Sequence, residues 1–331
     1  MTTSTLPTIV LLGTGGTIAS TAHHATALTD YAVTQGIESL LAAVPEMTAL
    51  ANIRCRQVFN VESHAITNKM LLKLASCINK ELANPAVDGI VVTHGTDTLE
   101  ETAYFLNLTI KSDKPVVLVG AMRPGSAISA DGPLNLYNAV LLASSPRASG
   151  HGVLVMLNDK IGAARFISKG ATTPVDAFRA YDQGYIGQVH ADHVHIFQTP
   201  ATLHTTQTEF DATGLKSLPQ VDIIYDHQDA GLHFYEASIN AGAQGIVIAA
   251  TGNGSLSATV AKGIKLAARH KVVCVRSSRT GSGVVTQLDA DSRMGVVSGS
   301  SLNPQKARIL LMLALGVTRE RDRIQGYFDR Y

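Results

Sequence analysis

The chain has 331 residues, which is long enough for two domains. Of these residues, 45% are apolar and 16% charged, a composition that excludes a disordered protein. Its formal net charge of +1 argues against nucleic acid or an anionic membrane as a partner, because both attract a basic excess. The longest apolar run, Ile309 to Leu315, falls far short of the roughly 20 residues that cross a bilayer.

Compartment is suggested by the start of the chain and by its cysteines. Met1 to Pro7 contains no Lys or Arg, and the apolar stretch after it enters a glycine turn without a cleavage pattern. We therefore expect no signal peptide and a cytoplasmic protein, with a periplasmic one as the alternative if a signal was removed. Three cysteines, an odd number without metal-like spacing, predict no disulfide framework.

Strand and helix patterns alternate in the first half of the chain, which predicts a mostly parallel sheet flanked by helices. Helical spacing predicts a helix ending near Leu82 and capped by Thr67, and further helices at 98–108 and 135–143. Ligands bind beyond the carboxyl ends of the strands in such sheets. Apolar runs place the strands at 8–12, 89–92, 116–119 and 153–157.

The pattern changes near residue 199, where apolar content drops and histidine and hydroxyl residues dominate. We predict an α/β protein with a large N-terminal domain at 1–198, a linker at 199–218 and a smaller C-terminal α/β domain at 219–331. The second domain is expected to contain strands at 221–225, 245–249 and 272–275, and helices near 257–268 and 303–315.

A glycine-rich turn, Gly13 to Ile18, follows the first strand. Ile18 stands where a dinucleotide-binding fingerprint needs its third glycine, and the Gly-Lys-Ser/Thr of a P-loop is missing. Two interpretations remain open. The turn is purely structural, or its glycines let a substrate approach Thr17 and nearby backbone N–H groups.

Thr96 and Asp97 follow the strand at 89–92. A carboxylate there can bind a substrate ammonium group, and a neighbouring threonine can attack or relay a proton. Asp97 or Thr98 also suits the cap of the helix that begins near Leu99, and both roles can hold together. Ser63 ends a predicted strand at 60–64, where spacing alone favours a turn serine.

Two further features look structural from the residues alone. His193 and His195 would share one strand face, with His190 nearby, but no carboxylate or cysteine has the companion spacing of a metal ligand. We favour a solvated hairpin and predict neither a metal nor a cofactor. Lys169 lies in a polar stretch and locally looks like a surface lysine.

Six segments together resemble the bacterial type II L-asparaginases, a family that includes the glutaminase-asparaginases. The resemblance covers essentially the whole chain. It implies hydrolysis of L-asparagine to L-aspartate and ammonia, weaker action on L-glutamine, and a homotetramer of two intimate dimers whose active sites are shared between subunits. The segments are GGTIA at 15–19, VTHGTDTLEETAY at 92–104, MRP at 122–124, SADG at 129–132, VRSSR at 275–279 and LNPQKAR at 302–308.

The resemblance also implies residue roles. Thr17 would be the nucleophile that forms an acyl ester, at the edge of a lid whose end carries Tyr31 against the Thr17 hydroxyl. Lys169 would lower the cost of deprotonating Thr96, and Asp97 would hold the α-ammonium of the substrate. Whether Tyr31 or the Thr96–Lys169 pair acts as the base stays open. The other substrate-binding positions are Gly16, Ser63 (for the α-carboxylate), His64 and Ala121.

Three positions depart from the family pattern. Ala290 stands where a partner-subunit glutamate is usual, so Asp289 or Asp291 is a candidate replacement. Ser255, expected to come from the partner as well, stands where some members have asparagine and points to tolerance of glutamine. His64 replaces a usual Gln or Glu, and when protonated it would repel the substrate ammonium, close to Glu62.

Specific residues distinguish this function from the alternatives. A dual glutaminase-asparaginase is a near alternative, because one methylene in the substrate changes the binding free energy by only ~1–3 kcal/mol. A catalytically inactive amino-acid sensor would not need Thr17. A nucleotide-dependent oxidoreductase is disfavoured by Ile18.

Overall fold

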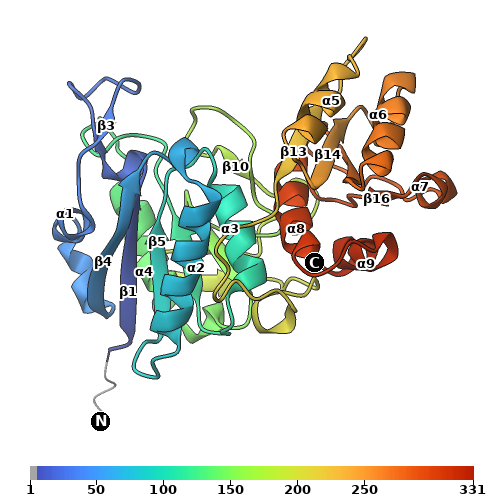
Figure 1. Cartoon of the computed structure of the whole chain (residues 1–331). Coiled ribbons are helices and arrows are strands. Elements are labelled where there is room, and N and C mark those ends of the chain that lie inside the picture. The colour runs from blue at the N-terminus through green and yellow to red at the C-terminus, as the bar shows by residue number, and fades with distance from the viewer. Residues whose placement is uncertain (1–5) are drawn as a thin grey trace. The chain divides into compact units, whose positions relative to one another are not determined.

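The computed structural model describes residues 6–331, which form two compact units, the first ending at Thr213 and the second beginning at Gly214. Each unit is built on its own β-sheet with helices packed on it, as predicted (Figure 1). Within residues 6–331, no helix combines the length and the apolar character needed to cross a membrane.

Unit 1 contains an eight-stranded sheet in the order β12-β11-β8-β7-β6-β5-β1-β4. The five strands from β7 to β4 are parallel, and β8, β11 and β12 continue the sheet antiparallel. Their bounds are β1 Thr8–Gly15, β4 Asn52–Val61, β5 Gly89–Thr93, β6 Val116–Val119, β7 Val153–Leu157, β8 Lys160–Ala163, β11 Gly187–His190 and β12 His193–Ile196.

Helices cover both faces of this sheet, because the central strands are apolar on both sides. α1 (Ile37–Ala42) and α4 (Gly132–Ser144) share a core with alternate strand residues such as Leu11 and Val91. α2 (Asn68–Leu82) and α3 (Leu99–Thr109) pack on the opposite face (Figure 1). Two short antiparallel pairs lie outside the sheet: β2 (Ser20–Thr21) with β3 (Ala32–Val33), and β9 (Ser168–Lys169) with β10 (Phe178–Arg179).

Local sequence signals agree with most of these elements. Thr67 caps α2 as predicted, its Oγ1 accepting from the N–H of Met70 at 3.3 Å. The histidines lie on a hairpin of β11 and β12, with His190 opposite His193. The strand predicted at 60–64 is wrong in part: β4 ends at Val61, and Ser63 begins a short 3-10 helix, η3 (Ser63–Ala65).

Unit 2 contains a parallel four-stranded sheet in the order β13-β14-β15-β16. α5 and α6 pack on the face formed by Ile246 and Ile248, while α8 packs on the other, where Leu311 fills the space above Gly245. The bounds are β13 Val221–Tyr225, β14 Gly245–Ala250, β15 Val273–Ser278, β16 Val296–Ser298, α5 His233–Asn240, α6 Ala258–Arg269, α7 Asp289–Met294, α8 Pro304–Leu315 and α9 Arg321–Arg330.

Part of the predicted linker packs against unit 1. Thr208 donates from Oγ1 to the carbonyl of Leu108 at 2.6 Å, and Lys111 donates from Nζ to the carbonyl of Thr208 at 2.7 Å. These bonds hold the segment that follows the short 3-10 helix η5 (Thr205–Gln207) onto the end of α3. The histidine and hydroxyl content that suggested a linker therefore serves contacts with the body of unit 1 here.

Candidate active site

The loops after β1, β4 and β5 meet at the carboxyl end of the unit 1 sheet. Gly16 has φ +86°, and a Cβ on it would lie 2.2 Å from the Cα of Gly95. The Gly16 N–H also donates to the carbonyl of Val61 at 3.1 Å. Only glycine allows this approach, so the glycine turn exists to bring the loops bearing Thr17, Ser63 and Thr96 together.

Thr17 and Tyr31 form one hydroxyl pair of the site. Thr17 begins the 3-10 helix η1 (Thr17–Ala19), is 8% exposed, and its Oγ1 lies 3.0 Å from the Tyr31 hydroxyl. The β2–β3 pairing, with Thr21 opposite Ala32, returns the chain so that Tyr31 reaches back. Either oxygen can donate in this bond, so a proton can pass between the threonine and the phenol.

Lys169 joins the other two catalytic candidates. Its Nζ donates to Thr96 Oγ1 at 3.0 Å and to Asp97 Oδ1 at 2.6 Å, although 73 and 72 residues separate them in sequence. The lysine side chain is only 15% exposed, whereas the Asp97 side chain is 63% exposed. A cation against the Thr96 oxygen favours its alkoxide form, and the exposed carboxylate keeps room for a second cation.

Ser63 is buried and ties the β4 and β5 loops to each other. Its Oγ accepts from the Asp97 N–H at 3.2 Å, and its carbonyl accepts from Thr98 Oγ1 at 2.8 Å. Of the two residues considered as caps, Thr98 is the N-cap of α3 by position, but its hydroxyl donates to the Ser63 carbonyl and makes no side-chain cap bond.

His64 and Glu62 are exposed and in contact with each other beside Ser63. The His64 Nε2 lies 3.3 Å from a Glu62 carboxylate oxygen, and their side chains are 65% and 47% exposed. The carboxylate thus lies where it offsets a charge on the imidazole. Ala121, the remaining predicted position of unit 1, follows β6 and is fully buried.

His94 is a buried histidine that contacts the backbone of the loop carrying Thr96. Its side chain is fully buried, and its Nδ1 lies 2.6 Å from the Gly95 carbonyl oxygen. Because a carbonyl oxygen only accepts, Nδ1 must carry the proton in this hydrogen bond. Burial lowers the pKa of His94 from 6.5 to about 4, so the ring is neutral near pH 7. We regard it as a structural group of the loop.

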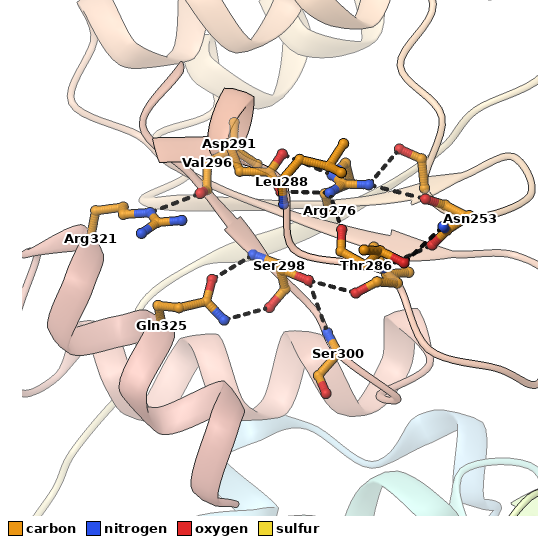
Figure 2. A network of polar contacts seen from close by, with 12 residues as sticks. Asn253, Arg276, Thr286, Leu288, Asp291, Val296, Ser298, Ser300, Arg321 and Gln325 are labelled. Atoms are coloured by element: carbon orange, nitrogen blue, oxygen red, sulfur yellow. Dashed lines mark hydrogen bonds and ion pairs between the residues drawn. The ribbon is translucent and has the colours of Figure 1, made fainter. Parts of the chain in front are cut away.

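In unit 2, Asp291 is ruled out as the replacement carboxylate. It is fully buried in α7 and accepts two bonds from Arg276, at 3.1 Å from Nε and 2.5 Å from Nη2 (Figure 2). Asp289, two residues earlier, is exposed and remains a candidate. Ser255 is exposed as well, in a turn closed by its N–H donating to the Thr251 carbonyl at 2.8 Å.

Nucleophiles other than the threonines are poorly placed. Burial raises the pKa of Cys274 to about 12, and burial also raises the pKa of Cys55 and of Cys77, so none is a ready thiolate. Among residues 6–331, no three His, Cys, Asp or Glu side chains gather as a metal-binding group. The chemistry that this geometry supports is nucleophilic attack by an assisted threonine.

Sequence reasoning gave Arg276 no role of its own. Its signal was an arginine directly after the apolar run 272–275, within the strand β15, where a buried charged side chain needs a partner. That partner, Asp291, lies 15 residues further on.

Comparison with known proteins agrees with the fold and the loops. The family model "Asparaginase, N-terminal" matches residues 8–202, and "Glutaminase/Asparaginase C-terminal domain" matches residues 220–328. "L-asparaginase 2" of Bacillus subtilis (strain 168) is 53% identical over 98% of this chain and 87% of its own length. "Glutaminase-asparaginase" of Pseudomonas fluorescens biotype A is 44% identical over 100% of this chain and 92% of its own.

A solved structure has the same fold throughout. The crystal structure of a "Probable Cytoplasmic L-asparaginase from Campylobacter jejuni" matches with a TM-score of 0.96 and 46% identity, covering 98% of this chain and 100% of that one. Two family models that together span most of the sequence, and relatives of this identity over nearly the whole length, show that the chain belongs to the bacterial type II asparaginase/glutaminase family.

Proposed function

We propose that this protein is an L-asparaginase, which hydrolyses L-asparagine to L-aspartate and ammonia and acts more weakly on L-glutamine. The observation that carries the proposal is the pair of assisted threonines at one sheet edge: Thr17 against Tyr31, and Thr96 against Lys169. The names of the Bacillus and Pseudomonas relatives support the two substrates. A cytoplasmic location is supported by the similar Campylobacter protein, which is described as probably cytoplasmic.

In the proposed reaction, the Thr17 oxygen attacks the side-chain carbonyl carbon, and its proton passes to Tyr31 or to the Thr96–Lys169 pair. Backbone N–H groups near Thr17 and Thr96 stabilise the oxyanion, each typically worth ~3 kcal/mol. The C–N bond then breaks, and the nitrogen takes a proton and leaves as ammonia. Water attacks the resulting ester, which releases L-aspartate and returns the proton to Thr17.

Recognition of the substrate uses the groups around these threonines. Asp97 is proposed to bind the α-ammonium, because its carboxylate is 63% exposed and can accept a second cation beside Lys169. Ser63 is proposed to bind the α-carboxylate. Gly16, Ala121 and His64 complete the unit 1 contribution. Ser255 and Asp289 of a partner subunit would close the site in a homotetramer of two intimate dimers.

The test is ammonia release from L-asparagine and L-glutamine at pH 7.5, with Thr17→Ala as the control variant. We expect a larger kcat/KM for asparagine, and loss of at least about 10³-fold in Thr17→Ala with unchanged folding. Mass spectrometry of the quenched reaction should detect an acyl ester on Thr17. Release that survives in Thr17→Ala would overturn the nucleophile assignment.

A dual glutaminase-asparaginase is the second candidate, favoured by the serine at Ser255. Comparable kcat/KM values for the two amides would establish it. Binding of asparagine without any ammonia release would instead identify an amino-acid sensor.

A further inference from the structure

Arg276 is a buried arginine whose side chain donates hydrogen bonds to several segments of unit 2. It lies in β15, is 1% exposed, and each of its five N–H groups has an acceptor (Figure 2). Two go to the carboxylate of Asp291. The others go to the backbone carbonyls of Asn253 and Gly254, both at 3.0 Å, and of Thr286 at 2.7 Å.

These acceptors belong to three separate segments: the turn after β14, the loop before α7, and α7 itself. The Asn253 side chain adds two bonds between the first two, accepting from the Thr286 N–H at 2.8 Å and donating to its Oγ1 at 2.9 Å. Asp291 also accepts from the Leu288 N–H at 2.9 Å. We call the turn 252–255 together with the segment 285–289 the unit 2 platform.

Burial distinguishes the platform from the ion pair that holds it. Arg276 and Asp291 are buried, whereas the platform residues Asn253, Ser255 and Asp289 are exposed. Asp289 is flanked by Leu288, whose N–H is held by Asp291, so the buried carboxylate fixes where α7 begins. The turn and the segment before α7 are joined to each other through the guanidinium and through Asn253.

We propose that Arg276 is a positioning residue for the reaction: together with Asp291, it keeps Ser255 and Asp289 at fixed positions from which they contact the substrate. The inference rests on the proposed function, which assigns those two residues to substrate. Asp289 has one methylene fewer than the glutamate usual in this family, so its carboxylate reaches less far. Its placement consequently depends on its backbone, which the Arg276–Asp291 pair fixes.

The side-chain chemistry explains why this position needs arginine. A lysine keeps the positive charge but offers three donors around a point, whereas five acceptors here surround a planar fork. Apolar residues often replace a buried ion pair without loss of stability, so stability alone is a weak reason for such a pair. Apolar residues cannot hold the three carbonyls of the turn after β14 and of the segment before α7, because they have no donors.

The test compares Arg276→Lys with Arg321→Lys, a matched change in α9, where Arg321 donates to the carbonyl of Val296 outside the platform. We expect kcat/KM for asparagine to fall at least tenfold in Arg276→Lys and less than twofold in Arg321→Lys. Hydrogen exchange should quicken at the N–H groups of Thr286 and Leu288 in Arg276→Lys only. A folded Arg276→Lys protein with kcat/KM within twofold of wild type would overturn the inference.

Asn253→Ala keeps the inference testable where Arg276→Lys does not fold, because it removes an exposed link and leaves the buried pair intact. It should lower kcat/KM several-fold and quicken exchange at Thr286, with little change in Tm. Full activity in folded Asn253→Ala with quickened exchange would show that activity does not depend on a fixed position of the unit 2 platform. Wild-type protein without ammonia release would instead sink the proposed function, and this inference with it.

Discussion

Two cation–carboxylate pairs, one in each unit, have similar distances and opposite designs. Lys169 meets Asp97 at 2.6 Å, and Arg276 meets Asp291 at 2.5 Å. The Lys169 ammonium is shared with a hydroxyl, and its carboxylate partner is mostly exposed. The Arg276 guanidinium has all its donors occupied, and both partners are buried.

The difference in exposure and in donor occupancy predicts different roles for the two pairs. A lysine can give up a proton or stabilise an alkoxide, and exposed Asp97 can accept a further cation. An arginine stays protonated, and with five acceptors around it no donor is left for a substrate. We therefore expect changes at the first pair to affect rate and changes at the second to affect stability and loop position.

Lys169→Met should give the largest effect, a fall in kcat of about 10³-fold, because assistance by a positioned acid or base contributes ~10²–10⁴-fold. Ammonia release under saturating asparagine measures it, with Tm as the check on folding. Lys160→Met is the matched control in the same unit, since the Lys160 ammonium contacts Gln188 at 3.4 Å and lies outside the candidate site. A Lys169→Met enzyme within tenfold of wild type would show that Thr96 needs no cation.

Asp291→Asn should lower the free energy of unfolding by about 3–5 kcal/mol, because it leaves the buried Arg276 charge without its partner. Asp97→Asn, which removes a carboxylate that is 63% exposed, should cost clearly less than Asp291→Asn, because solvent screens the Asp97 charge. Urea denaturation monitored by circular dichroism compares the two variants. Equal losses would contradict the distinction between the pairs.

Acid should destabilise the loop of unit 1 through His94. Burial lowers its pKa to about 4, so between pH 6.5 and 4 the unfolded chain binds a proton that the folded chain does not. The free energy of unfolding should consequently fall with pH by up to about 3 kcal/mol over this range. His94→Asn, which can still donate to the Gly95 carbonyl, should remove that part of the slope. Parallel pH profiles for the variant and wild type would refute it.

The smallest expected effect concerns His64. A positive charge at this position should repel the substrate ammonium, so His64→Lys should raise KM for asparagine several-fold, whereas the uncharged His64→Gln should change it less than about twofold. Glu62 lies 3.3 Å from His64 and would offset such a charge, so adding Glu62→Gln to His64→Lys should raise KM further. An unchanged KM in His64→Lys would rule this out.

Agreement between sequence and structure follows the range of the interactions. The buried strands of both units and the Thr67 cap depend on neighbours within a few residues, and they were predicted. The Thr98 cap bond was misread because the Thr98 hydroxyl donates to the Ser63 carbonyl, 35 residues away in sequence, and this contact outweighs the local cap preference. Asp291 was misread because its exposure depends on Arg276.

The sequence by itself determined the α/β class, the strand ends that carry threonines, and the family resemblance, because periodicity and contiguous motifs are local properties. Only the tertiary structure decided what the charged side chains do. Lys169 looked like a surface lysine until the fold brought the β9–β10 pair to Thr96, and Arg276 gained its contacts when the turn after β14, the segment before α7 and α7 itself closed around it. Such contacts join segments far apart in sequence, and their meeting is a property of the whole packed chain.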